Sequence, residues 1–95
     1  KPGMWAEHTL LVHCDDEADL AIPLRDVAHR HPDVYLKSLA KPFPAASAAG
    51  LQVIAVALAP TLTEAHTAAQ ATLDDLRRTA EAAGLHTSDV LSSTD

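Results

Sequence analysis

The chain has 95 residues, of which 47% are hydrophobic and 3% aromatic, and its formal net charge at pH 7 is −6. This length predicts one domain with a core of Ala, Leu and Val side chains rather than aromatic rings. The negative charge disfavours nucleic acid as a partner, because a basic surface supplies most of the non-specific affinity for phosphates.

Cysteine content and hydropathy bear on the cellular setting. Cys14 is the one cysteine, so an internal disulfide is excluded. No apolar run is long enough to span a bilayer, and we therefore expect a cytoplasmic protein with no membrane partner. Because the chain begins at Lys1 rather than at a methionine, we expect a piece of a longer protein.

The first residues are predicted to contain a linker and then a strand. Residues 1–7 (KPGMWAE) contain Pro and Gly, and their Met4 and Trp5 are expected to dock on the domain or on a neighbour. Residues 8–14 (HTLLVHC) are leucine-rich and too short for a helix, which indicates a strand.

A helix with an internal proline is expected next. Three acids, residues 15–17, suit the positive end of a helix that begins near Asp16. Pro23 lacks the N–H group that an interior turn needs, so the helix either starts late, near Asp19 or Ile22, or is kinked. Pro32 disfavours helical geometry at the preceding residue and ends the helix.

Two further strands are predicted, over residues 34–40 (VYLKSLA) and 51–59 (LQVIAVALA), and the proline-containing loop 41–50 joins them. The second of these strands is apolar on both faces. A sheet with helices on one side should be polar on the other, so the face with the smaller side chains indicates cover by another domain or a second copy. With the docking residues of the linker, that face forms the candidate interface: Met4, Trp5, Val53, Ala55 and Ala57. The alternative is that a short sheet tolerates exposed alanines.

The clearest helix signal spans residues 61–85. Thr61 and Glu64 have the spacing of a capping box, and Gly84 followed by Leu85 is typical of a helix C-terminus. Ala and Leu recur between them at three- and four-residue steps and form one apolar stripe. The polar residues 86–95 are predicted to be a flexible tail.

This order of strand, helix, strand, strand and helix predicts an α+β fold. We expect a two-layer sandwich in which a three-stranded sheet carries both helices on one face. The domain is expected to cover residues 8–85.

No constellation of residues points to a reaction. His13 and Cys14 are neighbours on a strand and point to opposite faces, and His29 and His31 do not share a helical face, so a zinc site is not expected. Cys14 is expected to be a core residue of the strand, next to three acids that would raise its pKa, which is the wrong setting for a nucleophile. Glycines are scattered and form no phosphate loop. We therefore predict no catalytic residue, no metal site and no cofactor.

A family resemblance lies in the central part of the chain. The run HPDVYLKSLAKPF (residues 31–43), followed by GLQVIAVALAP and a T-x-x-E helix that ends in LDDLRRTAEAAG, resembles the small KH-like domain of CinA-like proteins, the competence/damage-inducible family. That domain tends to read pDV-x-(I/L)-x-S-x-x-(K/R)-P after its first helix. The matching residues here are Pro32, Asp33, Val34, Leu36, Ser38 and Pro42.

The resemblance implies an accessory domain that is not itself an enzyme. In CinA-like proteins a molybdopterin-binding domain precedes it and is associated with pyrophosphate-type hydrolysis or ligand binding. Some members add a nicotinamide-nucleotide amidase, so the parent protein would be a nucleotide pyrophosphatase or amidase. The G-x-x-G loop with which KH domains grip nucleic acid is absent, and HRHPD (residues 29–33) stands in its place.

Three hypotheses of function follow, and the first is favoured. The domain packs against neighbouring domains of a longer chain or against its own copy in a homodimer, and it helps to shape the neighbour's ligand site. Alternatively it is a nucleic-acid-binding KH-type module, whose phosphate contacts would be Arg25, Arg30, Lys37 and Lys41. A small-ligand binder or independent enzyme is the third, and no residue supports it.

Overall fold

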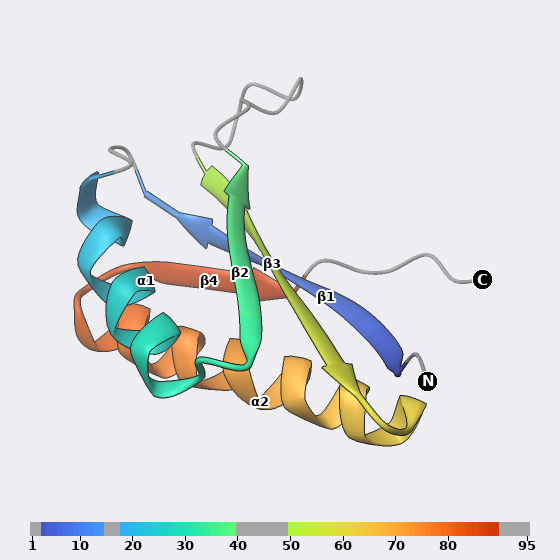
Figure 1. Cartoon of the computed structure of the whole chain (residues 1–95). Helices are drawn as coiled ribbons and strands as arrows, with labels where there is room; N and C mark the ends of the chain where they lie inside the picture. The colour runs from blue at the N-terminus through green and yellow to red at the C-terminus, as the bar shows by residue number, and fades with distance from the viewer. Residues whose placement is uncertain (1–2, 15–17, 40–49, 90–95) are drawn as a thin grey trace.

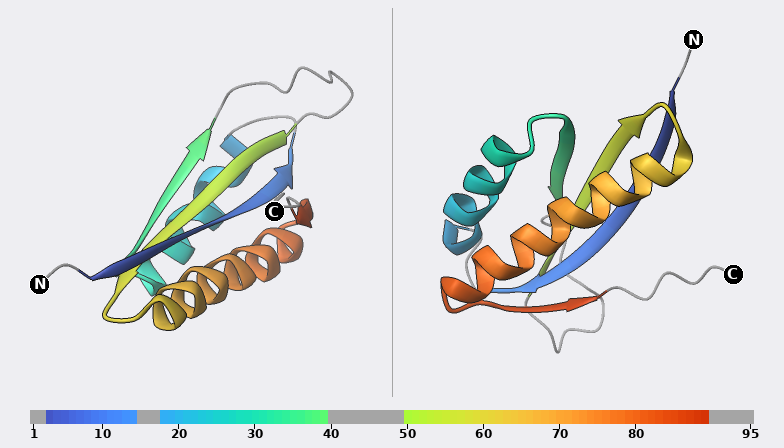
Figure 2. Two further views of the ribbon diagram at one scale, coloured as in Figure 1. Left: turned by 90° about the vertical axis from the view of Figure 1, so that its right-hand side faces the viewer. Right: turned by 90° about the horizontal axis from the view of Figure 1, so that it is seen from below.

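The computed structural model describes residues 3–14, 18–39 and 50–89 (Figure 1). The elements in chain order are β1 (Met4–His13), α1 (Ala18–Arg30), β2 (Val34–Leu39), β3 (Gly50–Ala59), α2 (Leu62–Ala82) and β4 (His86–Asp89). The strands form one antiparallel sheet in the order β2-β3-β1-β4. Both helices lie on the same face of it (Figure 2). The predicted α+β sandwich is confirmed, and this topology is the split βαβ, or ferredoxin-like, arrangement.

Within the described residues the sheet has four strands, so the prediction of three was wrong. The fourth strand, β4, lies within the segment predicted to be a flexible tail, and it pairs antiparallel with Leu10–His13 of β1. Its sequence, HTSD, has no apolar alternation that would mark a strand. Backbone pairing to an existing strand edge makes it a strand, and this depends on where the preceding turn directs the chain. Residues 90–95 of the predicted tail lie outside the described residues.

β1 is longer at its start than expected. It begins at Met4, inside the predicted linker, and pairs with β3 over its whole length from Met4↔Ala59 to His13↔Gly50. The ten-residue β3 offers a continuous row of backbone partners. These ladder hydrogen bonds extend β1 through a segment whose composition resembles a linker.

α1 begins at Ala18 in the described chain and runs through Pro23 without ending there. Pro23 is buried together with Leu20 and Val27, so its ring packs in the core as an apolar side chain. It has no backbone N–H to donate within the helix. A start near Ile22 is therefore excluded. The predicted acidic first turn, residues 15–17, lies outside the described residues.

α2 has the ends that its sequence predicts. The Thr61 side chain accepts a hydrogen bond from the Glu64 backbone N–H at 3.1 Å. At the other end Gly84 adopts a φ of 91°, its N–H donates to the Glu81 carbonyl, and the Leu85 N–H donates to the Ala80 carbonyl, both at 3.0 Å. These two bonds are the Schellman pattern, and a left-handed Gly makes them accessible.

The core lies between the helices and the sheet. α2 contributes its apolar stripe, and the sheet contributes the smaller side chains of β3: Val53, Ala55 and Ala57 are at most 1% exposed. The sequence-based interpretation placed these three residues on an uncovered face, and it was wrong. Small side chains on a strand let a helix pack closely against the backbone, so the bulky residues of β3 lie on the opposite face.

Candidate protein-interaction surface

The face of the sheet opposite the helices, here called the outer face, carries large apolar side chains from three strands. Trp5 of β1 is 59% exposed, Tyr35 of β2 is 64% exposed, and Leu58 of β3 is 67% exposed. Ile54 and Val56 of β3 are partly exposed on the same face. Both described helices lie on the opposite face of the sheet (Figure 2).

Strand register brings these side chains together. Successive residues of a strand point to opposite faces. Every second residue of β1 and β3 is buried beneath the helices, so the residues between them, including Trp5, Val56 and Leu58, point to the outer face. Trp5 lies directly opposite Leu58, and Tyr35 lies directly opposite Val56. Side chains opposite each other on one face have Cβ atoms about 4.5–5.5 Å apart. The apolar side chains are thus neighbours in one patch.

Two charged residues flank this patch. Glu7 of β1 and Lys37 of β2 both point to the outer face and lie on opposite sides of β3, since Glu7 pairs with Val56 and Lys37 with Ile54. Both side chains are exposed. An apolar centre bordered by solvated charges is the usual anatomy of a protein interface.

The candidate interface is therefore only partly the predicted one. The structure exposes Met4 (45%) and Trp5 on β1, and of these Trp5 lies on the outer face while Met4 lies on the helix-facing side; it buries Val53, Ala55 and Ala57 under the helices. Sequence reasoning missed the outward residues Tyr35, Ile54, Val56 and Leu58. The signal was present, because the alternate positions of β3 are bulky, but bulk alone was read as a sign of burial.

The predicted phosphate contacts do not share one face in the described chain. Lys37 lies on the outer face, whereas Arg25 and Arg30 belong to α1 in the helical layer. Lys41 lies outside the described residues. Arg30 is also occupied by an acidic partner on α2, so it does not form a basic patch with Lys37.

That partner is Asp75. Arg30 Nε donates to Asp75 Oδ2 at 2.9 Å and Arg30 Nη2 donates to Oδ1 at 3.0 Å, while His31 Nε2 donates to Oδ2 at 2.9 Å. Thr79 on the next turn donates to Oδ1 at 3.2 Å. Chiefly because of the hydrogen bonds from Arg30, the pKa of Asp75 falls to about 2. The cluster ties the end of α1 to α2, and we assign it a structural role.

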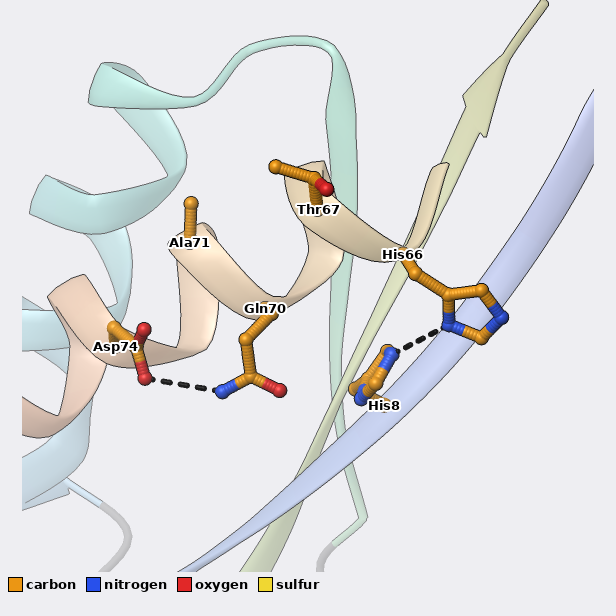
Figure 3. Close-up of a pocket in the computed structure, with 6 residues that line it drawn as sticks. All are labelled: His8, His66, Thr67, Gln70, Ala71 and Asp74. Atoms are coloured by element: carbon orange, nitrogen blue, oxygen red, sulfur yellow. Dashed lines mark hydrogen bonds between the residues drawn. The ribbon is translucent and has the colours of Figure 1, made fainter. Parts of the chain in front are cut away.

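A second polar cluster lies where α2 crosses β1 (Figure 3). His8 Nε2 is 2.8 Å from His66 Nδ1, and the rings meet edge to face with centroids 5.0 Å apart. An open hollow of about 450 Å³ adjoins this pair, and its lining residues are His8, His66, Thr67, Gln70, Ala71 and Asp74. Partial burial and the neighbouring His66 lower the pKa of His8.

The residues weighed for zinc from sequence are engaged separately. His13 Nε2 lies 2.8 Å from the Ser88 hydroxyl, and His31 contacts Asp75. Within residues 3–14, 18–39 and 50–89, no three His, Cys, Asp or Glu side chains gather closely enough to hold a metal ion. Neither α1 nor α2 combines the length and apolar character needed to cross a lipid bilayer.

Comparison with known proteins finds no matching family model and no matching curated protein. Among solved structures, the chain is similar to a C-terminal segment of the alpha subunit of aIF2 from Pyrococcus abyssi, with a TM-score of 0.60 and 15% sequence identity. The similarity covers 99% of this chain and 53% of that one, so this chain spans about half the length of its structural neighbour. At this identity the likeness shows a shared fold. The resemblance to CinA-like proteins stays a prediction.

Proposed function

We propose that this chain is a non-catalytic accessory domain that packs its outer face against another protein domain, either a neighbour in a longer chain or a second copy. The observation that carries the proposal is the contiguous exposure of Trp5, Tyr35 and Leu58 across three strands. Contiguous apolar patches on a solvated surface mark interaction sites, because covering them gains about 25 cal/mol per Å² of apolar area.

The chemistry of the patch supports a protein partner. Trp and Tyr are the residues most often found as energetic anchors of interfaces, since they bury a large area with few rotatable bonds. Glu7 and Lys37 at the border of the patch can set the orientation of a bound partner through complementary charges, while they themselves stay in contact with water. The structural neighbour is, by its description, a segment of one subunit, which fits a domain that works within a larger protein.

A CinA-like parent remains the family that we propose for this domain. The support is the pattern that begins at Pro32 and ends at Pro42. In that setting the outer face would pack against the neighbouring molybdopterin-binding domain and help to shape its ligand site. A parent sequence without such a domain would contradict this assignment and leave the proposed docking role of the outer face untouched.

Footprinting with hydroxyl radicals tests the docking role. We expect Trp5, Tyr35 and Leu58 to be modified readily in the isolated chain at low concentration. They should be protected in the longer parent protein or at high concentration, where sedimentation should show a dimer. Leu58→Asn should abolish the protection of Trp5. Ile22→Asn is the matched control, because Ile22 is 60% exposed but lies on α1. Equal modification of Trp5 in all states would overturn the proposal.

A nucleic-acid-binding role is the second candidate, and one observation favours it. Trp5 and Tyr35 present rings on a sheet face beside Lys37, and aromatic side chains on a sheet can stack on unpaired bases. The net charge of −6 opposes it. Fluorescence anisotropy with labelled single-stranded RNA at low salt separates the two: binding that weakens steeply with salt and with Lys37→Gln would favour nucleic acid over a protein partner.

A further inference from the structure

His8 and His66 form a close imidazole pair on the helical side of the sheet, away from the outer face. They are 58 positions apart in the chain, yet the facing nitrogens, His8 Nε2 and His66 Nδ1, are 2.8 Å apart. His8 comes from the helix-facing side of β1, between buried Ala6 and Leu10, and His66 follows buried Ala65 on α2. The fold, rather than local sequence, creates the pair.

The pair lies at an open edge of the sandwich. β4 pairs with β1 only at Leu10–His13, so in the described chain no strand adjoins His8 on the side away from β3. His8 is partly buried, while His66 is exposed and lies beside the open hollow (Figure 3). Solvent and small solutes therefore reach the two nitrogens.

The spacing of the nitrogens is close to that of two ligands on one metal ion. With metal–nitrogen bonds of about 2.0–2.1 Å, two cis ligands at a right angle are about 2.9 Å apart, and two tetrahedral ligands about 3.4 Å apart. The observed 2.8 Å is nearest to the right-angled case, which Cu²⁺ and Ni²⁺ prefer. In the metal-free pair this distance is that of a hydrogen bond, so each nitrogen must turn by about 45° away from the other for both lone pairs to meet on one ion.

We propose that His8 and His66 form a two-histidine binding site for a late first-row transition metal ion, with Cu²⁺ bound most tightly and Ni²⁺ and Zn²⁺ more weakly. Water or a small exogenous ligand completes the coordination, since no third His, Cys, Asp or Glu joins the pair within the described residues. Such a site is open and exchangeable, unlike a closed structural zinc site.

The protonation chemistry fits this site. In the metal-free pair one ring donates an N–H to the facing nitrogen of the other. On binding, the donor ring's proton moves through solvent to its far nitrogen, so both facing nitrogens offer lone pairs. Burial and the neighbouring His66 lower the pKa of His8.

Binding would also join β1 to α2. The unfolded chain does not hold these two histidines together, so a metal ion that binds the folded state alone stabilises it by mass action. We therefore expect the midpoint of thermal unfolding to rise with Ni²⁺ or Cu²⁺ concentration. The outer face takes no part in this site, so the proposed docking role and the metal site can fail independently.

Isothermal titration of the chain with Cu²⁺ at about pH 7.5 tests the site, together with thermal unfolding in Ni²⁺. We expect one Cu²⁺ per chain, and affinity at least about tenfold lower in both His8→Gln and His66→Gln, with the thermal stabilisation lost. Circular dichroism would check that both variants fold, as expected for residues outside the core.

Two matched control variants test whether Cu²⁺ binds at His8 and His66. His29→Gln removes an exposed histidine of α1, and His86→Gln removes the residue opposite His13 in the β1–β4 pair. Both should bind Cu²⁺ as the unaltered chain does. Undiminished binding in His8→Gln and His66→Gln, or loss of binding in His86→Gln, would overturn the proposal. Electron paramagnetic resonance of bound Cu²⁺ should report two nitrogen ligands, and a single one would also overturn it.

Discussion

Arg30 holds Asp75 with two parallel hydrogen bonds, of 2.9 Å from Nε to Oδ2 and 3.0 Å from Nη2 to Oδ1, and so fastens the end of α1 to the middle of α2. This is the bidentate geometry that an arginine fork and a carboxylate favour. The Arg30 side chain is half exposed and that of Asp75 is mostly buried, at 50% and 15% relative exposure. Solvent screens the pair in part, and its contribution is modest.

Asp75→Asn should lower the free energy of unfolding by about 1–2 kcal/mol, because it removes a charge-assisted acceptor of Arg30, His31 and Thr79. Urea denaturation monitored by circular dichroism measures the change. Asp74→Asn is the control on the same helix, since Asp74 accepts a hydrogen bond from Gln70 on its own helix. Equal losses in the two variants would contradict the importance of the Arg30 contact.

The same carboxylate predicts an acid-dependent loss of stability. Its pKa is about 2 in the folded chain, below the value of about 3.9 expected when unfolded. The unfolded state therefore takes up the proton first as pH falls, and the stabilisation, fully present above about pH 5, is lost between about pH 4 and pH 2. Denaturation curves at a series of pH values should show the difference from Asp75→Asn shrinking over this range. A constant difference down to pH 2 would contradict the assignment.

The inward orientation of the small side chains of β3 is testable by overpacking. Ala55 is 0% exposed beneath the helices, so Ala55→Leu should destabilise the fold by about 1–3 kcal/mol. Val56 is the next residue and points to the outer face, and Val56→Leu should change stability by less than about 0.5 kcal/mol. Guanidinium denaturation of both variants measures the two changes in the free energy of unfolding. If Val56→Leu were the more damaging, the two faces would be reversed.

The helix-ending residue Gly84 should resist substitution for a conformational reason. Its φ of 91° suits glycine, while an added Cβ would meet no atom within 4 Å, so crowding is not involved. Gly84→Ala should therefore cost about 1 kcal/mol through backbone strain alone. Gly84→Asn should cost less, because Asn tolerates the left-handed region better. Thermal unfolding gives both values, and an unchanged midpoint in Gly84→Ala would show that the turn relaxes.

Helix α2 and both of its ends could be predicted from the sequence, because their signals are local. Thr61 caps α2 through the Glu64 N–H, and Gly84 with Leu85 ends it, because these bonds join residues only a few positions apart. The α+β class followed from the order of those elements. Such local hydrogen bonds can be predicted from one sequence, since the two partners are near neighbours along the chain.

The length of β1, the existence of β4 and the identity of the outer face depend on contacts between distant parts of the chain. Met4 is in a strand because Ala59 lies opposite it, and His86 because His13 does. Both faces of β3 are apolar, so its pattern could not say which face the helices cover. The helices cover the face of β3 that carries Ala55, because its small side chains allow close packing. The opposite face, with Leu58, is therefore exposed, and His8 on the helix-facing side contacts His66.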